Sequence, residues 1–353
     1  MDLNLKSLRR EIDRIDNNIL QMLQKRLEVA RLVVKFKQEL HQDINVPERE
    51  TQILDSLKGR ERSLLSAEMI EDIYRTIFAE SKRLQSESKP LVAFQGEHGA
   101  HSEVACRRWN PNIAPIPCPE FVDVFKGVVE GSYEYGIVPI ENTVGEMASQ
   151  VNKYLLDSEL YIVGAVEMAV QHSLLVAPGV DYRNLRRVYS HPVALAECQK
   201  FIQRMKLEAI PYFDTAGAAK MLAEQWPEGT AAIASELAAK YYNLDVLYDS
   251  VGDVANTRTR FVVLAKKPLE NGGNKCSITF TTENRPGALF NIMQLFAEQN
   301  INLTRIDSVP DEKGDYLFFM DFSASSHDES VQEILARIQE ASTFYRFLGC
   351  YTE

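Results

Sequence analysis

The sequence has few of the features that mark secreted, membrane-bound or zinc-stabilised proteins. Its five cysteines, Cys106, Cys118, Cys198, Cys276 and Cys350, are an odd number, are widely spaced and include no CxxC pair. We therefore expect reduced thiols, without a disulfide framework or a structural zinc. The amino terminus lacks a basic segment followed by an apolar one, and no apolar run is long enough to span a membrane. These absences predict a cytoplasmic protein that does not enter a membrane.

The chain also lacks an excess of basic residues and a dinucleotide-binding fingerprint. Its 39 Lys and Arg residues against 50 Asp and Glu residues give a net charge of −11, which disfavours nucleic acid as a partner. Residues 1–85 are close to neutral, so nearly all of that charge lies in the remainder. Gly96 and Gly99 follow an apolar run, but their spacing is not GxGxxG. We expect no dinucleotide site.

At 353 residues the chain is long enough for two or three domains. Polar stretches at residues 86–90, which end in proline, and 270–274, which contain two adjacent glycines, are typical of linkers. They divide the chain into segments 1–86, 90–267 and 274–353. The first segment has a helical pattern, the second alternates strands with helices, and the third follows the order βαββαβ.

The first segment predicts three helices, at about residues 5–40, 48–57 and 65–86. Its apolar residues recur at the three-and-four spacing of an amphipathic helix. This stripe consists of Leu8, Ile12, Ile15, Ile19, Met22, Leu23, Ala30, Val33 and Val34. A helix of that length cannot bury such a stripe alone, and three helices make too thin a core for a monomer. We therefore expect a dimer.

Basic residues on the first helix are placed too regularly for scattered surface charge. Arg26 and Lys37 are three helical turns apart, so they project from one face with Cα atoms roughly 16 Å apart. Arg9 is rotated by about 100° from that face and is better placed to reach a site in a partner chain. Long basic side chains that converge on one ligand indicate a site for a small dianion. The alternative is that these charges are solvated residues of a dimerisation helix.

Residues 5–86 resemble the all-helical chorismate mutase family. The resemblance rests on the opening Leu8-Arg9-Arg10-Glu11-Ile12-Asp13, on the turn Pro47-Glu48-Arg49-Glu50, and on Ser81 and Gln85 in the third helix. It implies that Arg26 and a partner-chain Arg9 bind the two carboxylates of chorismate. Arg49 and Ser81 would also line the substrate site.

The same resemblance assigns the groups that act near the reacting atoms. Lys37 and Gln85 would donate hydrogen bonds to the ether oxygen, where negative charge grows as the bond breaks, and Glu50 would hold the ring hydroxyl. A Claisen rearrangement needs positioning and preorganised donors, and neither a nucleophile nor a proton transfer. Val46 stands where the family usually has Asp, so we expect a lost hydroxyl contact and weaker turnover.

The second segment has the pattern of an α/β unit with two lobes. Short apolar strands alternate with helical stretches near residues 100–109, 120–130, 193–205 and 214–225. Ligands bind at the strand ends of such sheets. Strings of polar residues lie at the expected strand ends, at residues 94–103, 138–143, 190–192, 214–216 and 256–261.

In this order the strings resemble prephenate dehydratase over about residues 90–267, with Thr259-Arg260-Phe261 as the family's hallmark. The resemblance implies a two-lobed, periplasmic-binding-protein-like fold with Thr259 as the catalytic residue. The residues that it places around prephenate are Arg260, Asn142, Ser190, His191 and Thr215. Singly, the strings have simpler explanations, because Asp214 is typical of a helix N-cap and Ser190 before Pro192 of a turn. His191 fits a turn-stabilising residue equally well.

The implied reaction needs a proton. Prephenate loses its ring hydroxyl as water and its ring carboxylate as CO2, so the protein must protonate the departing oxygen. A threonine hydroxyl is too weak an acid to be the final proton source. We therefore assign Thr259 a positioning and relay role, with Glu141, His191 or a water behind it. The family usually has Asn two residues before this Thr, whereas here Thr257 occupies that position and Asn256 precedes it.

The third segment resembles an ACT domain, the ligand-sensing module of amino-acid enzymes. The expected elements are strand 275–282, helix 287–300, strand 302–308, strand 315–323, helix 328–340 and strand 344–351. Backbone N–H groups of Gly287, Ala288 and Leu289 at the first helix start can take a carboxylate. By the resemblance, Asp307 and Ser308 would complete a site for phenylalanine.

One position departs from the effector motif of phenylalanine-regulated dehydratases. Their usual Glu-Ser-Arg-Pro reads Asp307-Ser308-Val309-Pro310 in this chain. Because Val309 cannot make the ionic contacts of an arginine, we expect phenylalanine binding to be weakened.

Together these resemblances predict a multidomain enzyme with an all-α dimeric mutase domain, an α/β two-lobed dehydratase domain and an α+β ACT domain. It would convert chorismate through prephenate to phenylpyruvate without a cofactor or metal, as a homodimer or higher homo-oligomer. One alternative is a dehydratase whose mutase segment is only a dimerisation arm, for which Val46 is the evidence. The other is a non-catalytic amino-acid sensor, against which the intact Thr-Arg-Phe string argues.

Overall fold

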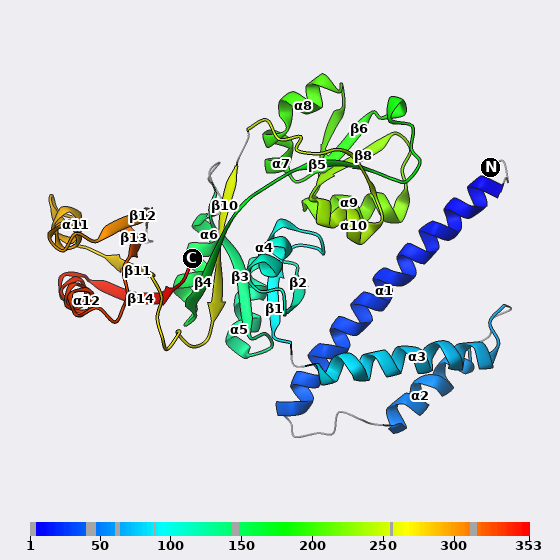
Figure 1. The fold of residues 1–353 in the computed structure, drawn as a ribbon, viewed down its shortest axis with the longest axis horizontal. Helices are drawn as coiled ribbons and strands as arrows, with labels where there is room; N and C mark the ends of the chain where they lie inside the picture. Colours follow the sequence, from blue (N-terminus) through cyan, green and yellow to red (C-terminus); the bar gives the residue numbers. More distant parts are fainter. Residues whose placement is uncertain are drawn as a thin grey trace. The chain divides into compact units, whose positions relative to one another are not determined.

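The computed structural model describes residues 5–39, 47–60, 64–87, 89–142, 148–254, 257–310 and 316–353. By its internal contacts the chain divides into two compact units, Met1–Lys89 and Pro90–Glu353 (Figure 1). Val46 and Asn256, two positions that depart from the family patterns, lie outside the described residues. Within those residues, no helix is both long enough and apolar enough to cross a membrane.

The first unit consists of three helices, α1 (Leu5–Glu39), α2 (Pro47–Lys58) and α3 (Ala67–Ser86), close to the three that the sequence predicts. Helix α3 begins where the Ser66 hydroxyl accepts a hydrogen bond from the Met69 N–H group at 3.2 Å, which is an N-cap. It packs against both α1 and α2, whereas the amino-terminal half of α1 extends beyond that pair (Figure 1). Only part of α1 is therefore covered within the unit.

The apolar stripe of α1 is largely exposed. Ile12 is 56% exposed, Ile19 50% and Met22 59%, whereas Val34 is buried. Helix α2 has no buried residue. Contiguous exposed apolar residues of this kind mark an interaction surface.

The second unit begins with a lobe built on a five-stranded sheet of order β2-β1-β3-β10-β4. Its strands are β1 (Leu91–Gln95), β2 (Ala114–Cys118), β3 (Tyr135–Asn142), β4 (Tyr161–Ala169) and β10 (Arg258–Ala265), and its helices are α4 (His101–Trp109), α5 (Phe121–Glu130) and α6 (Ala148–Asp157). Strands β2, β1 and β3 are parallel, and β10 runs antiparallel between β3 and β4. Although β10 follows the second lobe in sequence, it lies inside the first lobe's sheet.

The second lobe is built on a sheet of order β7-β6-β8-β5-β9. Its strands are β5 (Ser173–Val176), β6 (Arg187–Ser190), β7 (Glu208–Pro211), β8 (Thr230–Ala234) and β9 (Asp245–Tyr248), and its helices are a 3-10 turn at Tyr182–Asn184, α7 (Pro192–Glu197), α8 (Gln199–Arg204), α9 (Thr215–Gln225) and α10 (Glu236–Tyr242). The chain crosses between the lobes twice, from β4 to β5 and from β9 to β10. This is the two-lobed architecture expected from the sequence.

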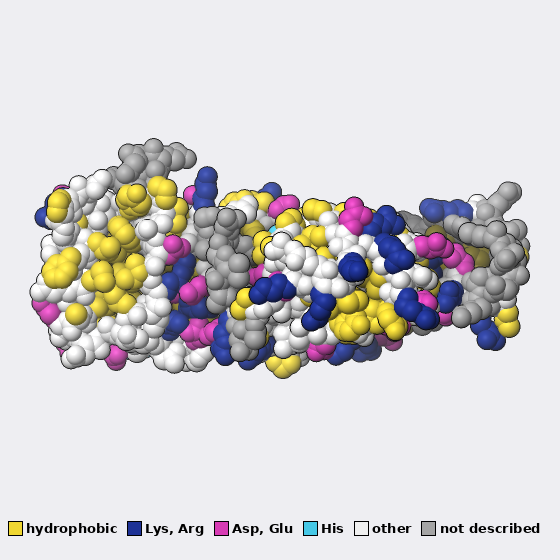
Figure 2. All heavy atoms as spheres, turned by 90° about the horizontal axis from the view of Figure 1, so that it is seen from above, with side chains coloured by type: hydrophobic (Ala, Val, Ile, Leu, Met, Phe, Trp, Pro, Cys, Tyr) yellow, Lys and Arg dark blue, Asp and Glu magenta, His cyan; other side chains and the backbone are white. Residues whose placement is uncertain are grey.

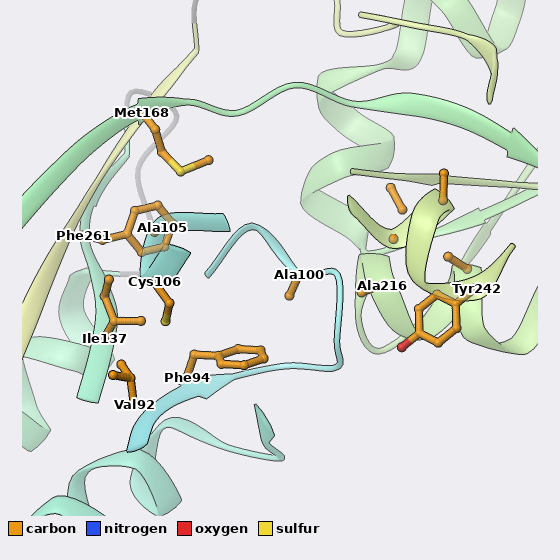
Figure 3. Close-up of a cluster of buried hydrophobic side chains, with 14 of the residues drawn as sticks. Val92, Phe94, Ala100, Ala105, Cys106, Ile137, Met168, Ala216, Tyr242 and Phe261 are labelled. Carbon is orange, nitrogen blue, oxygen red and sulfur yellow. The ribbon is translucent and has the colours of Figure 1, made fainter. Parts of the chain in front are cut away.

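A shared core joins the lobes. In Figure 3, Phe261 of the first lobe lies beside Ala105 of α4, and Ala100 lies between these residues and Ala216 of the second lobe. The loop before α4 approaches α10 so closely that a Cβ at Gly99 would lie 2.5 Å from Cα of Ala238, and Gly99 has a φ of +86°. Both facts require glycine at this position.

The third segment, which the sequence likens to an ACT domain, completes the second unit. Its antiparallel sheet has the order β12-β13-β11-β14. The elements are β11 (Lys275–Thr281), α11 (Ala288–Glu298), β12 (Asn302–Pro310), β13 (Tyr316–Ser323), α12 (Glu329–Ala341) and β14 (Phe344–Tyr351). Both helices cover the sheet face that points away from the first lobe (Figure 1). On the other face, Phe319 and Leu348 share a buried core with Ile162 and Val262 of that lobe.

The fold class predicted from the sequence is confirmed, with two local differences. The predicted helix 193–205 is broken at Cys198 into α7 and α8. The break is stabilised because the Asp253 carboxylate accepts hydrogen bonds from the backbone N–H groups of Lys200 and Phe201, at 2.8 and 3.3 Å. A continuous helix would use those groups internally.

Several short elements, including β2, were not expected. Strand β2 contains Pro115 and Pro117, which cannot donate to a ladder, and it pairs only with β1 at the sheet edge. Proline within a sheet is tolerated on edge strands, at strand starts and at bulges, and β2 is an edge strand.

Candidate functional sites

In the helical unit, two predicted site residues are in direct contact across α1 and α3. The Arg26 guanidinium donates a hydrogen bond of 2.8 Å to the Ser81 hydroxyl and lies over the Phe78 ring, 5.4 Å from its centroid. Ser81 is buried and donates to the Ile77 carbonyl. One turn further on, the Gln85 side chain donates to the Ala30 carbonyl at 3.2 Å. Arg26, Ser81 and Gln85 therefore lie on facing sides of α1 and α3.

Glu50 and Arg49 lie at the start of α2. The Glu50 carboxylate forms an ion pair of 2.8 Å with Lys82 of α3, and Arg49 donates to the Gln52 side chain at 3.4 Å. Lys82 was not expected at the site. It follows Ser81 directly and has no motif of its own that could have identified it.

Lys37 and Arg9 lie on α1, on either side of Arg26 in sequence. Lys37 is partly buried, whereas Arg9 is exposed. Seventeen residues of helix separate Arg9 from Arg26, roughly 25 Å along the axis. The single chain therefore does not bring Arg9 to the other predicted site residues.

In the two-lobed part of the second unit, the strand order brings Thr259 and Asn142 to the same edge of one sheet. Thr259 lies near the start of β10 and is paired with Asn142, the last residue of β3, and with Met168 in β4. The Thr259 side chain is buried. For Asn142 the structure describes the backbone only.

Ser190 and His191 lie at the carboxyl end of β6 in the second lobe. Ser190 is fully buried and donates a hydrogen bond of 2.6 Å to the Ile233 carbonyl. His191 is the N-cap of α7, and its Nδ1 atom accepts from the Val193 N–H group at 3.3 Å. A neutral ring that accepts through Nδ1 carries its proton on Nε2. His191 thus has the turn-stabilising contact that the sequence left open.

Thr215 is the first residue of α9, directly after its N-cap, Asp214. The Asp214 carboxylate accepts hydrogen bonds from the N–H groups of Gly217 at 3.0 Å and Glu97 at 3.2 Å. Burial raises the pKa of Asp214, and these hydrogen bonds oppose that rise. The cap expected at Asp214 is confirmed, and it also joins a first-lobe loop to the second lobe.

Arg260 points away from the Thr259 side of the strand. Successive side chains of a strand face opposite sides of the sheet. Phe261 belongs to the core shared by the two lobes, whereas Val262 belongs to the core shared with the ACT domain. The Arg260 guanidinium accordingly pairs with Asp321 and Glu353 of the ACT domain. The structure does not bring Arg260 to the other predicted dehydratase residues.

A buried polar trio near the lobe crossing was missed from the sequence. His172 Nε2 lies 2.7 Å from Glu197 Oε2, and the ring of His101 lies edge-on to that of His172 at 5.3 Å between centroids. Burial, with a smaller contribution from His172, lowers the pKa of His101 to about 3. Among the described residues, His101 Nε2, His172 Nδ1 and Glu197 Oε1 are buried without a hydrogen-bond partner. Because three separate segments supply these residues, no local pattern could have revealed them.

A second buried acid, Glu103, holds the two lobes together. Its carboxylate accepts hydrogen bonds from Gly99 N–H at 2.9 Å, from Arg107 at 2.7 Å and from the Tyr241 hydroxyl of the second lobe at 2.9 Å. Burial alone would raise the pKa of Glu103. Interactions with His98, Gly99 and Arg107 outweigh burial and leave the pKa lowered.

In the ACT domain, the expected effector residues lie on α11 and β12. Gly287 is the N-cap of α11 with a φ of +84°, and no atom lies within 4 Å of a Cβ built there. Ala288 and Leu289 lie in the first turn, and Ala288 lines a cavity of about 340 Å³ together with Arg285 and Arg337.

On β12, Asp307 is already engaged. Its carboxylate accepts a hydrogen bond of 2.9 Å from Asn152 of α6 and one of 3.2 Å from Arg305. Ser308 is the next residue, and Val309 packs against the core shared with the first lobe. Within the described residues, no three His, Cys, Asp or Glu side chains are grouped to hold a metal ion.

Family models match the chain in the same order as these folds. The chorismate mutase type II model matches residues 8–86, the prephenate dehydratase model residues 92–269 and the ACT domain model residues 277–342.

A relative of similar architecture is the bifunctional chorismate mutase/prephenate dehydratase of Aquifex aeolicus. It is 33% identical, and the match covers 98% of this chain and 97% of the relative. The chain belongs to this bifunctional family. It combines a chorismate mutase domain, a prephenate dehydratase domain and an ACT domain. It is an enzyme, both a chorismate mutase and a prephenate dehydratase. The family, fold and overall function inferred from the sequence are confirmed.

Other relatives match about three quarters of the chain. Arogenate dehydratase/prephenate dehydratase 2 of Arabidopsis thaliana, a chloroplastic protein, is 41% identical over 75% of this chain and 73% of its own length. The solved structure of prephenate dehydratase from Arthrobacter aurescens in complex with L-Phe is 28% identical and has a TM-score of 0.69. That match covers 74% of this chain and 90% of the other.

Proposed function

We propose that the helical unit converts chorismate to prephenate, that the two-lobed domain converts prephenate to phenylpyruvate, and that the ACT domain binds phenylalanine. The observation that carries the proposal is the presence of all three family domains in one chain. The arrangement of the predicted residues in each domain supports it, as argued below.

For the mutase, we propose the site between α1 and α3. Arg26 and Ser81 are already in contact there, and Gln85 lies one turn further along α3. Such donors, held before the substrate arrives, suit a rearrangement whose transition state places charge on an ether oxygen. Lys37 and Gln85 would supply the hydrogen bonds to that oxygen, while Arg26 and Arg49 would bind carboxylates.

We further propose that the mutase is a cytoplasmic dimer, in which Arg9 reaches the site of the other chain. The exposed stripe of α1 supports this, because Ile12, Ile19 and Met22 would otherwise remain in water. The five cysteines are free and buried, as in proteins of reducing compartments. Hydrophobic side chains also gather on the ACT surface (Figure 2), where Phe290 is 65% exposed and Tyr316 50%.

For the dehydratase, we propose a site at the strand ends, with Thr259 as the catalytic positioning residue. Asn142 ends the neighbouring strand. In the second lobe, Ser190 ends β6, His191 caps α7 and Thr215 begins α9. Prephenate would lose its carboxylate as CO2 and its hydroxyl, once protonated, as water. Because Nδ1 of His191 accepts from the Val193 N–H group, an Nε2–H group on this ring could hydrogen-bond and orient the departing hydroxyl, and a water would deliver the proton.

One assay tests both activities. Purified protein is given chorismate, and prephenate and phenylpyruvate are followed separately. We expect prephenate to form first and phenylpyruvate to follow. Turnover of added prephenate without any turnover of chorismate would favour the second candidate, a dehydratase whose helical unit serves only for dimerisation, for which Val46 is the specific observation.

The similarity to a plant arogenate dehydratase/prephenate dehydratase raises a substrate question. Arogenate carries an ammonium group where prephenate carries a keto group, so the two substrates differ in a group that the site must recognise. We propose prephenate as the preferred substrate, since the match to a bifunctional mutase/dehydratase extends over the whole chain. Comparing kcat/KM for the two substrates tests this, and a higher value for arogenate would contradict it.

For regulation, we propose that phenylalanine inhibits the dehydratase by binding at the start of α11. The open position above Gly287 leaves room for a carboxylate at the helix start, while Val309 lacks the charge of the usual arginine. We expect weak binding, removed by Gly287→Asp because the new carboxylate repels that of the ligand. Calorimetry showing no heat, together with no change in thermal midpoint at millimolar phenylalanine, would contradict the proposal.

A further inference from the structure

Arg260 is a buried cation in the strand that carries Thr259, on the face opposite to the proposed dehydratase site. Its side chain is only 7% exposed. A buried charge is costly unless it is paired and hydrogen-bonded. The contacts that satisfy this guanidinium therefore indicate what holds this end of β10 in place.

The guanidinium is bound by three groups of the ACT domain. Nη1 lies 2.5 Å from Asp321 Oδ2 in β13, Nη2 donates to the Tyr351 hydroxyl in β14 at 2.7 Å, and Nε donates to the Glu353 carboxylate. The burial of Arg260 opposes its charge, but its interactions with Tyr351, Asp321 and Glu353 prevail and raise its pKa. The cation is thus bound by three ACT groups at once.

These partners are themselves fixed within the ACT sheet. The Ser277 hydroxyl of β11 lies 2.6 Å from Asp321 Oδ1 and 2.7 Å from the Tyr351 hydroxyl, and Glu353 is also paired with Lys275. The polar groups around Arg260 therefore form a closed network over β11, β13 and β14. Such a network positions its members more firmly than isolated pairs do.

The same region of β10 is irregularly paired on its β3 side, although its pairing with β4 continues without a shift from Arg258 to Val263. The pairing of β10 with β3 shifts register between Arg260 and Phe261, and the residue opposite Phe261 is Pro139. A proline supplies no N–H group to the ladder, and a bulge changes the direction of nearby side chains. On its β3 side, the segment carrying Thr259 is thus separated by an irregularity from the regular part of the strand.

We propose that Arg260 is a positioning residue of the dehydratase reaction. Held from the ACT domain by Asp321, Tyr351 and Glu353, it fixes the end of β10 and so places the Thr259 hydroxyl against the substrate. The ACT domain then contributes to the turnover of prephenate even without an effector. This inference rests on the proposed role of Thr259.

The network also extends towards the expected effector strand. Arg305 of β12 lies 4.0 Å from Asp321 and 3.2 Å from Asp307, whose carboxylate is bonded to Asn152 in the first lobe. A shift in the position of β12 would therefore alter the surroundings of Asp321, one of the groups that hold Arg260.

The test is the steady-state kinetics of the full-length enzyme with prephenate. We expect Arg260→Gln to lower kcat by at least tenfold with KM within twofold of wild type, and Arg260→Lys to recover part of the loss. Asp321→Asn and Tyr351→Phe, which alter only the ACT side, should also lower kcat. The double variant Arg260→Gln with Asp321→Asn should lose no more than the worse single variant, since both remove one shared contact.

Arg258→Gln is the matched control, because Arg258 lies two residues earlier on the same strand in an exposed ion pair with Glu167 at 3.0 Å. It should keep wild-type kinetics. If Arg260→Gln fails to fold, Tyr351→Phe still decides the question, because it removes only the contacts of the Tyr351 hydroxyl with Arg260 and Ser277 and leaves the Arg260 charge paired with Asp321 and Glu353.

Two results would overturn the proposal. A raised KM with kcat retained in Arg260→Gln, with both ACT-side variants unaffected, would make Arg260 a direct substrate contact. A lowered thermal midpoint with unchanged kcat and KM would make the network purely structural. Thr259→Ala, measured alongside, separates the positioning role of Arg260 from the proposed role of Thr259. Full activity in that variant would remove the role of Thr259, whereas the effect of the ACT-side variants on kcat would stand by itself.

Discussion

The two units of this chain differ in how far each completes its own site. In the helical unit, α2 has no buried residue and the α1 stripe lies in water, and Arg9 is remote from Arg26 along the helix. In the unit Pro90–Glu353, buried cores join the two lobes and join the first lobe to the ACT domain. We infer that the mutase site is shared between chains, whereas each chain holds its own dehydratase site.

The largest expected effect is that of Thr259→Ala on the dehydratase. Loss of a group that positions the transferred proton should lower phenylpyruvate formation by about 1,000-fold, within the range for acid–base groups, while prephenate accumulates from chorismate. Thr259→Ser keeps the hydroxyl and should keep part of the activity. Coupled assays of both products measure this, and full activity in the alanine variant would place catalysis elsewhere.

Lys37→Ala should impair the mutase reaction of the helical unit and spare the dehydratase reaction. Because Lys37 would stabilise charge that exists mainly in the transition state, its loss should lower mutase turnover on the order of 100-fold or more. Turnover of added prephenate should persist. If both activities fell together while the fold stayed intact, the separation of the two sites would be wrong.

A smaller effect concerns the stability of the second unit in acid. The folded pKa of His101 is lowered from 6.5 to about 3 by burial, so below pH 6.5 the unfolded chain binds a proton that the folded chain does not. His101 should therefore cost nothing above pH 6.5 and destabilise the fold progressively as the pH falls towards 3. At pH 5 the loss should be about 2 kcal/mol.

Urea unfolding of wild type and His101→Phe at pH 7 and pH 5 measures this contribution. The phenylalanine variant should lose less stability between the two pH values than wild type does. The exposed His327→Phe variant serves as the control and should keep the wild-type dependence. An unchanged pH dependence in His101→Phe would show that His101 does not resist protonation in the fold.

The sequence predicted long periodic elements well and short irregular ones poorly. The three helices of the first unit end within a few residues of their predicted bounds, because a sustained apolar period leaves little ambiguity. Strand β2 was missed because its prolines conceal an edge strand, and the break at Cys198 depends on Asp253, which lies far away in sequence. Tertiary contacts of this kind have no local signal.

The site residues give a sharper lesson. Reading Thr259-Arg260-Phe261 as one motif placed both Thr259 and Arg260 at the substrate, although the two-residue period of a strand already puts their side chains on opposite faces. The contact between Arg26 and Ser81, by contrast, follows from helical spacing on two facing helices. His101, His172 and Glu197 meet only because the two lobes meet, so their grouping required the fold.

Subunit exchange tests the difference between the units most directly. Arg9→Ala and Lys37→Ala proteins, each nearly inactive as a mutase, are mixed and allowed to exchange chains, with heterodimers verified by mass spectrometry. One of the two sites in each heterodimer would then have both residues intact, so mutase activity should recover to roughly a quarter of wild type. Mixing Lys37→Ala with Gln85→Ala, whose residues serve the same chain's site, should restore nothing. No recovery in the first mixture after verified exchange would contradict a site shared between chains.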